Sequence, residues 1–95
     1  NTSYKWSSYR DCPFVNKTLI NEYMTIGEGG WYSKMYTIMM SISANSIRRG
    51  YPITPDEVER LVREIDMDTG GWYKNRPVKL EAKRAIDFAL RSVSS

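Results

Sequence analysis

The chain has 95 residues and a formal net charge of +3, with 41% hydrophobic and 26% charged residues. This usage excludes a disordered chain, and the length fits one globular domain with a single modest core. The absence of histidine and the presence of a single cysteine, Cys12, exclude nucleophile pairs that need histidine, histidine-based metal sites and an internal disulfide. The lone cysteine, with no signal-peptide pattern and no long apolar run, predicts a reducing, cytoplasmic location without a membrane partner.

Residues 1–14 show no helical period, and we expect an extension or a linker from a preceding domain that Trp6 and Phe14 hold against the core. Residues 15–95 are expected to form an all-α domain, a small bundle of about four helices. The first predicted helix is short and starts at Asn16, whose side chain suits an N-cap. It runs to about Met24 and is stopped by Gly27.

The second predicted helix, from about Trp31 to Arg49, has an unusually wide apolar arc and should be covered on several sides. Its central stripe follows the i, i+3, i+4, i+7 spacing and consists of Met35, Ile38, Met39 and Ile42. Arg48 and Arg49 lie in its last turn, before Gly50, where cations complement the helix dipole. The same two arginines are also candidates for phosphate binding.

The third predicted helix has a strong start. Thr54 is its N-cap, Pro55 takes the first helical position and Glu57 closes a capping box. Its apolar stripe, which should lie on the second helix, consists of Val58, Leu61, Val62 and Ile65. The last helix is predicted from about Val78 to Arg91, with Lys79 and Lys83 on an outer stripe. Its buried residues should be Ala82, Ile86, Ala89 and Leu90.

Asp66 and Asp68, followed by Gly70-Gly71, resemble two kinds of metal site. A calcium loop would need a bidentate Glu at its twelfth position, where this chain has Pro77. A polymerase-type pair of aspartates should sit on a strand with distant acidic and histidine support, whereas these residues follow a helix. We interpret both aspartates as residues that end the helix and start a turn, and we assign no metal ligand.

Aromatic residues are interleaved with cations at two places, which is the strongest functional signal. Trp31-Tyr32-Ser33-Lys34 opens the second helix, where free backbone N–H groups favour an anion. Trp72-Tyr73-Lys74-Asn75-Arg76 leads into the last helix. Single-stranded nucleic acid is held by rings that stack on bases and by cations that neutralise phosphates. The candidate nucleic-acid or nucleotide-binding residues are Tyr32, Lys34, Arg48, Arg49, Tyr73, Lys74, Arg76, Lys79 and Lys83. Trp31 and Trp72 fit a core or lid position at least as well as a stacking one, and no catalytic residue is assigned.

The order of these signals resembles the C-terminal helix-bundle domain that follows the catalytic domain in archaeo-eukaryotic-type primases and primase-polymerases of plasmids and phages. The resemblance extends from Gly29 to Leu90. It rests on Gly29-Gly30 before Trp31, Arg49-Gly50, Ile53-Thr54-Pro55-Asp56-Glu57-Val58 and Arg76-Pro77-Val78-Lys79-Leu80-Glu81. Many members carry Arg-Asn after the first of these glycines, where this chain has Trp31-Tyr32 with Lys34 following.

The resemblance implies an accessory domain of a replicative primase-polymerase. Such a domain grips a single-stranded DNA template and helps to hold the initiating nucleotide near a catalytic primase domain in the same or a partner chain. It implies no intrinsic cofactor; the ligand would be ATP or another NTP with Mg²⁺, at an initiation site shared with the catalytic domain. Positioning can dominate the rate of initiation, because two nucleotides must be aligned before a primer exists.

Two other functions stay open on the sequence. One is a helix-turn-helix-like module of a replication initiator or regulator that binds duplex DNA, although the connection from Arg48 to Thr54 is long for such a turn and the next helix starts acidic. The other is a protein-interaction domain without nucleic-acid binding, using an adaptable methionine surface of Met35, Met39 and Met40.

Overall fold

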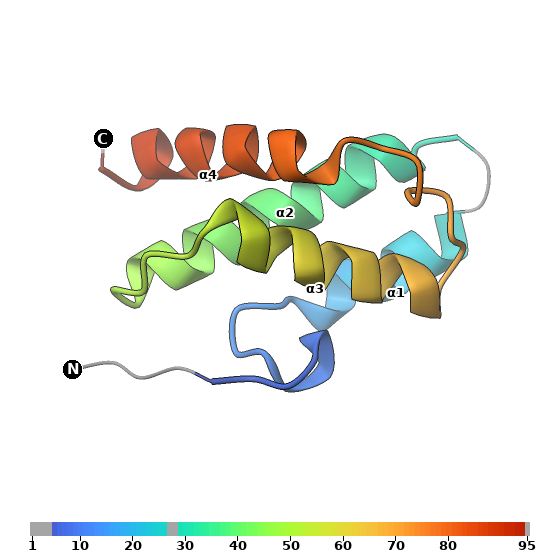
Figure 1. Ribbon diagram of the computed structural model, residues 1–95, viewed down its shortest axis with the longest axis horizontal. Coiled ribbons are helices and arrows are strands. Elements are labelled where there is room, and N and C mark those ends of the chain that lie inside the picture. The colour runs from blue at the N-terminus through green and yellow to red at the C-terminus, as the bar shows by residue number, and fades with distance from the viewer. Residues whose placement is uncertain (1–4, 27–28, 95) are drawn as a thin grey trace.

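The computed structural model describes residues 5–26 and 29–94. They form a 3₁₀ turn, η1 (Tyr9–Asp11), and four helices, α1 (Lys17–Ile26), α2 (Trp31–Arg48), α3 (Pro55–Asp68) and α4 (Val78–Ser94). This part of the chain contains no strand, so the predicted all-α class is confirmed. Figure 1 shows α2 running through the middle of the bundle, with α4 along one side of it and α3 crossing in front. None of the helices within the described ranges is both long and apolar enough to cross a membrane.

The central position of α2 follows from its wide apolar arc. This helix packs against α1, α3 and α4. The predicted stripe of Met35, Ile38, Met39 and Ile42 is fully buried. Ser43 and Ser46 are buried as well, and their hydroxyls donate to carbonyls of their own helix, that of Met39 at 2.8 Å and that of Ser43 at 2.9 Å. These small side chains are hydrogen-bonded within α2 and therefore allow its neighbours to approach closely.

The start of α3 has the predicted capping box. The Thr54 hydroxyl accepts from the backbone N–H of Glu57 at 3.3 Å, and the Glu57 carboxylate accepts from the backbone N–H of Thr54 at 2.9 Å. The Tyr51 hydroxyl donates to the second oxygen of Glu57. The apolar stripe predicted for this helix is buried throughout, at Val58, Leu61, Val62 and Ile65.

The last helix differs from its prediction in two respects. It extends to Ser94, beyond the predicted end at Arg91. Ala82, Ile86 and Ala89 are buried as expected, but Leu90 is 47% exposed, and its predicted burial is wrong. The buried face of α4 is centred on Ala85 and Ala89, and successive residues of an α-helix are about 100° apart, so the residue after Ala89 turns outward.

The N-terminal segment is part of the packed core. Cys12 and Phe14 are buried, and Trp6 packs edge-on against Phe14 with ring centroids 5.6 Å apart. Trp6 also contacts Tyr51, at 5.7 Å, so the segment covers the connection between α2 and α3. The predicted anchoring by Trp6 and Phe14 is therefore confirmed.

The first helix has the expected N-cap, because the side-chain oxygen of Asn16 accepts from the backbone N–H of Thr18 at 2.9 Å. It continues two residues beyond Met24, to Ile26. The predicted stop at Gly27 lies outside the described residues.

Candidate nucleic-acid interface

The candidate site is built where the loop between α3 and α4 passes the start of α2. Asp66 positions this loop: its buried carboxylate accepts from the backbone N–H of Tyr73 at 3.0 Å and from the hydroxyl of Tyr23 at 2.9 Å. Trp72 then packs edge-on against Tyr23, with ring centroids 5.3 Å apart. The loop is thus tied to both α1 and α3 before α4 begins.

Two tyrosines and an arginine stack at this point. The ring of Tyr32, at the start of α2, is parallel to that of Tyr73 within 7°, with centroids 6.0 Å apart. The guanidinium of Arg76 lies over the Tyr32 ring, 4.5 Å from its centroid. Tyr32 is 42% exposed, whereas Tyr73 is 1% exposed. Tyr32 and Arg76 therefore form a ring-and-cation surface that solvent reaches, and Tyr73 supports it from beneath.

A buried carboxylate holds Arg76 in place. The guanidinium donates to Oε2 of Glu81 at 2.6 Å, and the Glu81 side chain is only 4% exposed. Burial raises the pKa of Tyr73 well above its ordinary value, and the nearby Glu81 carboxylate adds to the shift. The Tyr73 phenol therefore stays neutral at physiological pH, and its hydroxyl donates to the backbone carbonyl of Tyr32 at 3.4 Å.

The outer face of α4 continues the cationic surface. Its exposed cations are Lys79, Lys83, Arg84 and Arg91. Lys79 is paired with Asp56 at 3.0 Å and Lys83 with Asp87 at 3.5 Å, and all four side chains are more than half exposed. Exposed ion pairs of this kind are weak because water and salt screen both charges, so a phosphate can displace either carboxylate at little cost.

Lys79 and Lys83 border a groove of about 600 Å³ between the starts of α3 and α4. Its lining also includes Pro77, Val78 and Leu80 from the loop and α4, and Arg63 from α3. The predicted outer stripe of Lys79 and Lys83 therefore lies along the border of this groove and not on a flat helix face.

The remaining predicted residues do not all reach this surface. Lys34 is paired with Glu22 of α1 at 2.8 Å, and Lys74 is exposed on the loop, where its carbonyl accepts from Arg63 at 3.3 Å. Arg48 and Arg49 lie at the opposite end of the 18-residue helix α2 from Tyr32. The Arg49 guanidinium donates to the Pro13 carbonyl at 3.4 Å.

For two kinds of candidate residue the structure differs from the prediction. The sequence predicts that Tyr73 stacks on a base, but its ring is buried and has no face open to a ligand. Arg48 and Arg49 are exposed yet distant from the aromatic residues, and their place in the last turn fits the helix-dipole interpretation. Trp31 and Trp72 both pack against the core, as expected.

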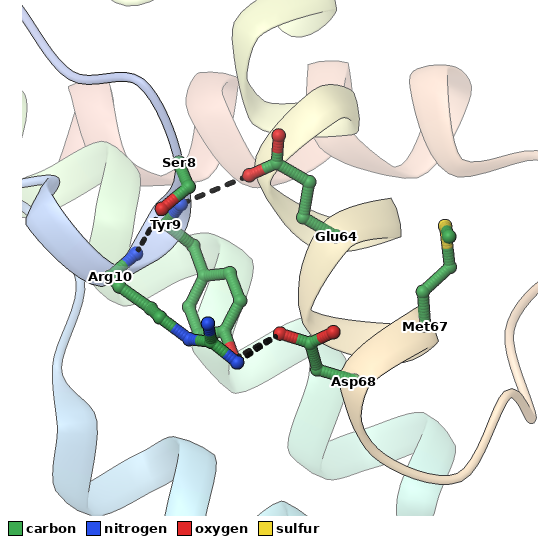
Figure 2. A pocket seen from close by; sticks show the side chains of 6 residues that line it. All are labelled: Ser8, Tyr9, Arg10, Glu64, Met67 and Asp68. Atoms are coloured by element: carbon green, nitrogen blue, oxygen red, sulfur yellow. Dashed lines mark hydrogen bonds and ion pairs between the residues drawn. The ribbon is translucent and has the colours of Figure 1, made fainter.

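The two aspartates that resemble a metal pair serve different contacts. Asp66 is turned inward to Tyr23 and Tyr73, as described above. Figure 2 shows Asp68 turned toward the N-terminal segment, where its carboxylate accepts from the Tyr9 hydroxyl and pairs with Arg10, both at 2.8 Å. Within residues 5–26 and 29–94 no three acidic or thiol side chains are grouped as metal ligands.

The pocket in Figure 2 joins η1 to the end of α3. It measures about 140 Å³ and is lined by Ser8, Tyr9, Arg10, Glu64, Met67 and Asp68. Glu64 accepts from the backbone N–H of Tyr9 at 3.0 Å. Because both of its carboxylates are already bonded to the N-terminal segment, this pocket serves to anchor that segment.

The structure also brings in residues that the sequence did not single out. A hollow of about 450 Å³ lies beside Tyr32, between the first turns of α2 and the start of α4. Its lining consists of Tyr32, Ser33, Tyr36, Thr37, Glu81 and Arg84. Nothing local in the sequence distinguishes Tyr36 from the other residues of the wide apolar arc of α2, or Glu81 from a solvent-exposed helix carboxylate.

No protein-family model matches this chain, and neither does any curated protein or any solved structure.

Proposed function

We propose that this chain is an accessory module that binds single-stranded nucleic acid, as part of a primase-polymerase in which it grips the template and helps to position the initiating nucleotide. The observation that carries the proposal is the exposed Tyr32 ring with the Arg76 guanidinium over it, next to the cationic face of α4. The guanidinium plane of Arg76 over the Tyr32 ring can stack on a base, and Arg84, which lines the same hollow as Tyr32, can neutralise a flanking phosphate.

The charge on α4 supports the same function. Four of its exposed side chains are cations, Lys79, Lys83, Arg84 and Arg91, and the exposed acidic residue among them is Asp87. Glu81, the other carboxylate of this helix, is buried and bonded to Arg76. The face that α4 turns to solvent is therefore more basic than the net charge of +3 suggests.

Geometry favours this function over the two alternatives. The start of α3, the helix that would enter a groove in a helix-turn-helix module, presents the exposed carboxylate of Asp56, which would repel duplex phosphates. The methionine surface required by an interaction domain is reduced, because Met35 and Met39 are fully buried. We therefore rank single-strand binding first.

The test replaces three exposed lysines of the candidate interface, in a Lys74→Gln, Lys79→Gln, Lys83→Gln variant. Arg76 is spared because it is bonded to a buried carboxylate. Binding of a labelled single strand of about 20 nucleotides is measured by fluorescence anisotropy between about 50 and 200 mM salt. If each lysine neutralises one phosphate, the slope of log Kd against log salt falls by about 2 and binding weakens at every salt concentration.

A variant with the same loss of charge is the control. Lys5, Lys17 and Arg60 are exposed and lie outside the candidate interface, and their replacement by Gln should leave the salt slope within about 0.5 of the parent. Equal slopes for the two triple variants would overturn the assigned surface. An absence of any binding at low salt would overturn single-strand binding itself.

A further inference from the structure

A groove runs along α3 on the side that faces the following loop and the start of α4. It consists of the depression of about 600 Å³ described above and a second one of about 130 Å³, and the two adjoin because Arg63 and Val78 line both. On α3 the lining includes Pro55, Glu59, Arg63 and Met67, which are four positions apart and therefore form one row on the helix surface. This row is about 18 Å long, at about 1.5 Å per residue.

The floor of the groove is apolar and solvent reaches it. Leu80, from the first turn of α4, is 51% exposed, and Met67, at the far end of the row on α3, is 83% exposed. Pro55, Pro77 and Val78 add aliphatic surface next to Leu80. Apolar side chains that line one depression and stay exposed are typical of an interaction site.

Cations border this apolar floor. They are Arg63, Lys74, Lys79 and Lys83. Among the described residues that line the groove, the carboxylates are the buried Asp66 and Glu59, which is paired with Arg63 at 3.2 Å. The pairs that Lys79 and Lys83 form with Asp56 and Asp87 lie at the exposed surface and are weak. The groove therefore combines an apolar floor with a positively charged border.

We propose that this groove binds an acidic amphipathic helix of a partner protein. The apolar side chains of that helix lie on Leu80 and Met67, and its carboxylates meet the bordering lysines. A helix of three turns is about 16 Å long, which matches the row on α3. Helices that are recognised in this way place apolar residues at spacings of three and four in a groove. This docking site does not depend on the proposed function.

A strand of nucleic acid suits the groove less well than a peptide. Bases are held by stacking on aromatic rings, and the one ring among the described lining residues is that of Tyr73, which is 1% exposed. Aliphatic side chains such as Leu80 instead gain from contact with the aliphatic side chains of a peptide. The charge of the border fits both ligands, so the floor decides between them.

The probe is a fluorescein-labelled synthetic peptide of about 14 residues, with leucines at spacings of three and four and with Glu or Asp at the flanking positions. A scrambled peptide of the same composition keeps the charge and loses the apolar stripe. Binding of each to the unmodified chain is measured by fluorescence anisotropy at a fixed salt concentration. We expect the scrambled peptide to bind at least about 10-fold more weakly. Equal affinities, or no binding of either peptide, would overturn the proposal.

Leu80→Gln tests the floor of the groove. Loss of the apolar contact should weaken binding of the amphipathic peptide about 10-fold. Phe88→Gln is the matched control, because Phe88 is also 51% exposed on α4 and lies outside the lining of the groove, and this variant should bind the peptide within about 2-fold of the parent. Both side chains are exposed, so neither substitution disturbs the core. Equal affinities of the two variants would overturn the assignment of the groove.

The same variants distinguish the peptide from a nucleic-acid strand. A labelled single strand of about 20 nucleotides should bind Leu80→Gln and the parent within about 2-fold of each other. A loss of strand binding in Leu80→Gln as large as the loss of peptide binding would assign the groove to nucleic acid and overturn the proposal. Stripe-dependent peptide binding by a chain that binds no strand would support the docking site and remove the proposed function. Strand binding without stripe-dependent peptide binding would do the reverse.

Discussion

Asp66 is the residue on which the candidate interface depends most directly. Its carboxylate joins the hydroxyl of Tyr23 on α1 to the backbone of Tyr73 in the loop, and its carbonyl accepts from the backbone N–H groups of Thr69 and Gly71 at 3.2 and 2.9 Å. All of these groups lie at the end of α3 or next to it. A residue that resembles half of a metal pair in the sequence is thus a structural acceptor that fixes where Tyr73 lies.

Replacing Asp66 should therefore destabilise the fold. In Asp66→Ala the buried Tyr23 hydroxyl and the Tyr73 N–H lose their acceptor, and we expect the free energy of unfolding to fall by about 2–3 kcal/mol. Urea unfolding followed by circular dichroism measures this change. Asp68→Ala is the control and should change stability much less, because its partners, the Arg10 guanidinium and the Tyr9 hydroxyl, bond to it at the exposed surface. Equal losses in the two variants would contradict the role assigned to Asp66.

The buried hydrogen bond between Tyr23 and Asp66 makes the free energy of unfolding depend on pH in the alkaline range. Burial raises the pKa of Tyr23 far above its ordinary value, and the hydrogen bond to Asp66 raises it further. The folded state therefore keeps a proton that the unfolded chain loses above pH about 10, so this contribution is complete below that pH and falls as the pH rises. We expect the free energy of unfolding to decline from pH about 10 to 11, and to decline less steeply in Tyr23→Phe. Parallel declines in urea titrations of the two proteins would contradict this prediction.

The first residues of α3 and α4 are fixed by different kinds of contact. At the start of α3 the contacts are local, because Thr54, Pro55 and Glu57 are close together in sequence and form the capping box. The start of α4 depends on a salt bridge from the preceding loop, in which Arg76 reaches the buried Glu81. The first kind of start can be recognised from a short motif, and the second depends on which residues the fold buries.

The local cap leads to a prediction for α3. Thr54→Ala removes the acceptor for the backbone N–H of Glu57, and the free energy of unfolding should fall by about 1 kcal/mol. Thr37→Ala, an exposed threonine inside α2, is the control and should change stability by no more than about 0.5 kcal/mol. Chemical denaturation of both variants measures the difference, and a Thr54 variant as stable as the Thr37 variant would show that the cap is dispensable.

At the scale of the whole molecule, the N-terminal segment and the helices share one core. Phe14 is completely buried, and its backbone carbonyl accepts from the side chain of Asn45 on α2 at 3.0 Å. Trp6 and Tyr51 complete an aromatic cluster with Phe14. The segment before α1 therefore takes part in the stability of the bundle.

The two phenylalanines of the chain provide a direct test. Phe14→Ala should lower the free energy of unfolding by about 3–5 kcal/mol, because it leaves a cavity in the core. Phe88 is 51% exposed on α4, and Phe88→Ala should change stability by about 0.5 kcal/mol or less. The comparison uses urea unfolding of both variants. A small effect of Phe14→Ala would show that residues 5–14 form a dispensable extension.

The helices can be predicted from the sequence alone, because the signals that define them act over a few residues. The capping box at Thr54, the N-cap at Asn16 and the apolar stripes of α2 and α3 need no knowledge of the rest of the chain. The same local pattern failed at Leu90. Its position relative to the buried face of α4 depends on how the helix is rotated about its axis in the bundle. A rotation by one residue position, about 100°, moves a side chain from the buried face to the solvent-facing side.

Which members of the aromatic and cationic motifs reach solvent depends on how the helices and the loop before α4 pack together. Tyr32 and Tyr73 occupy equivalent places in two similar sequence segments, yet one ring is exposed and the other is covered because the loop before α4 folds over the start of α2. Burial of Glu81, and with it the hollow beside Tyr36 and Arg84, likewise arises from contacts between residues about 50 positions apart in the chain. Local propensity fixes the elements, whereas the exposure of a side chain depends on which elements pack against it.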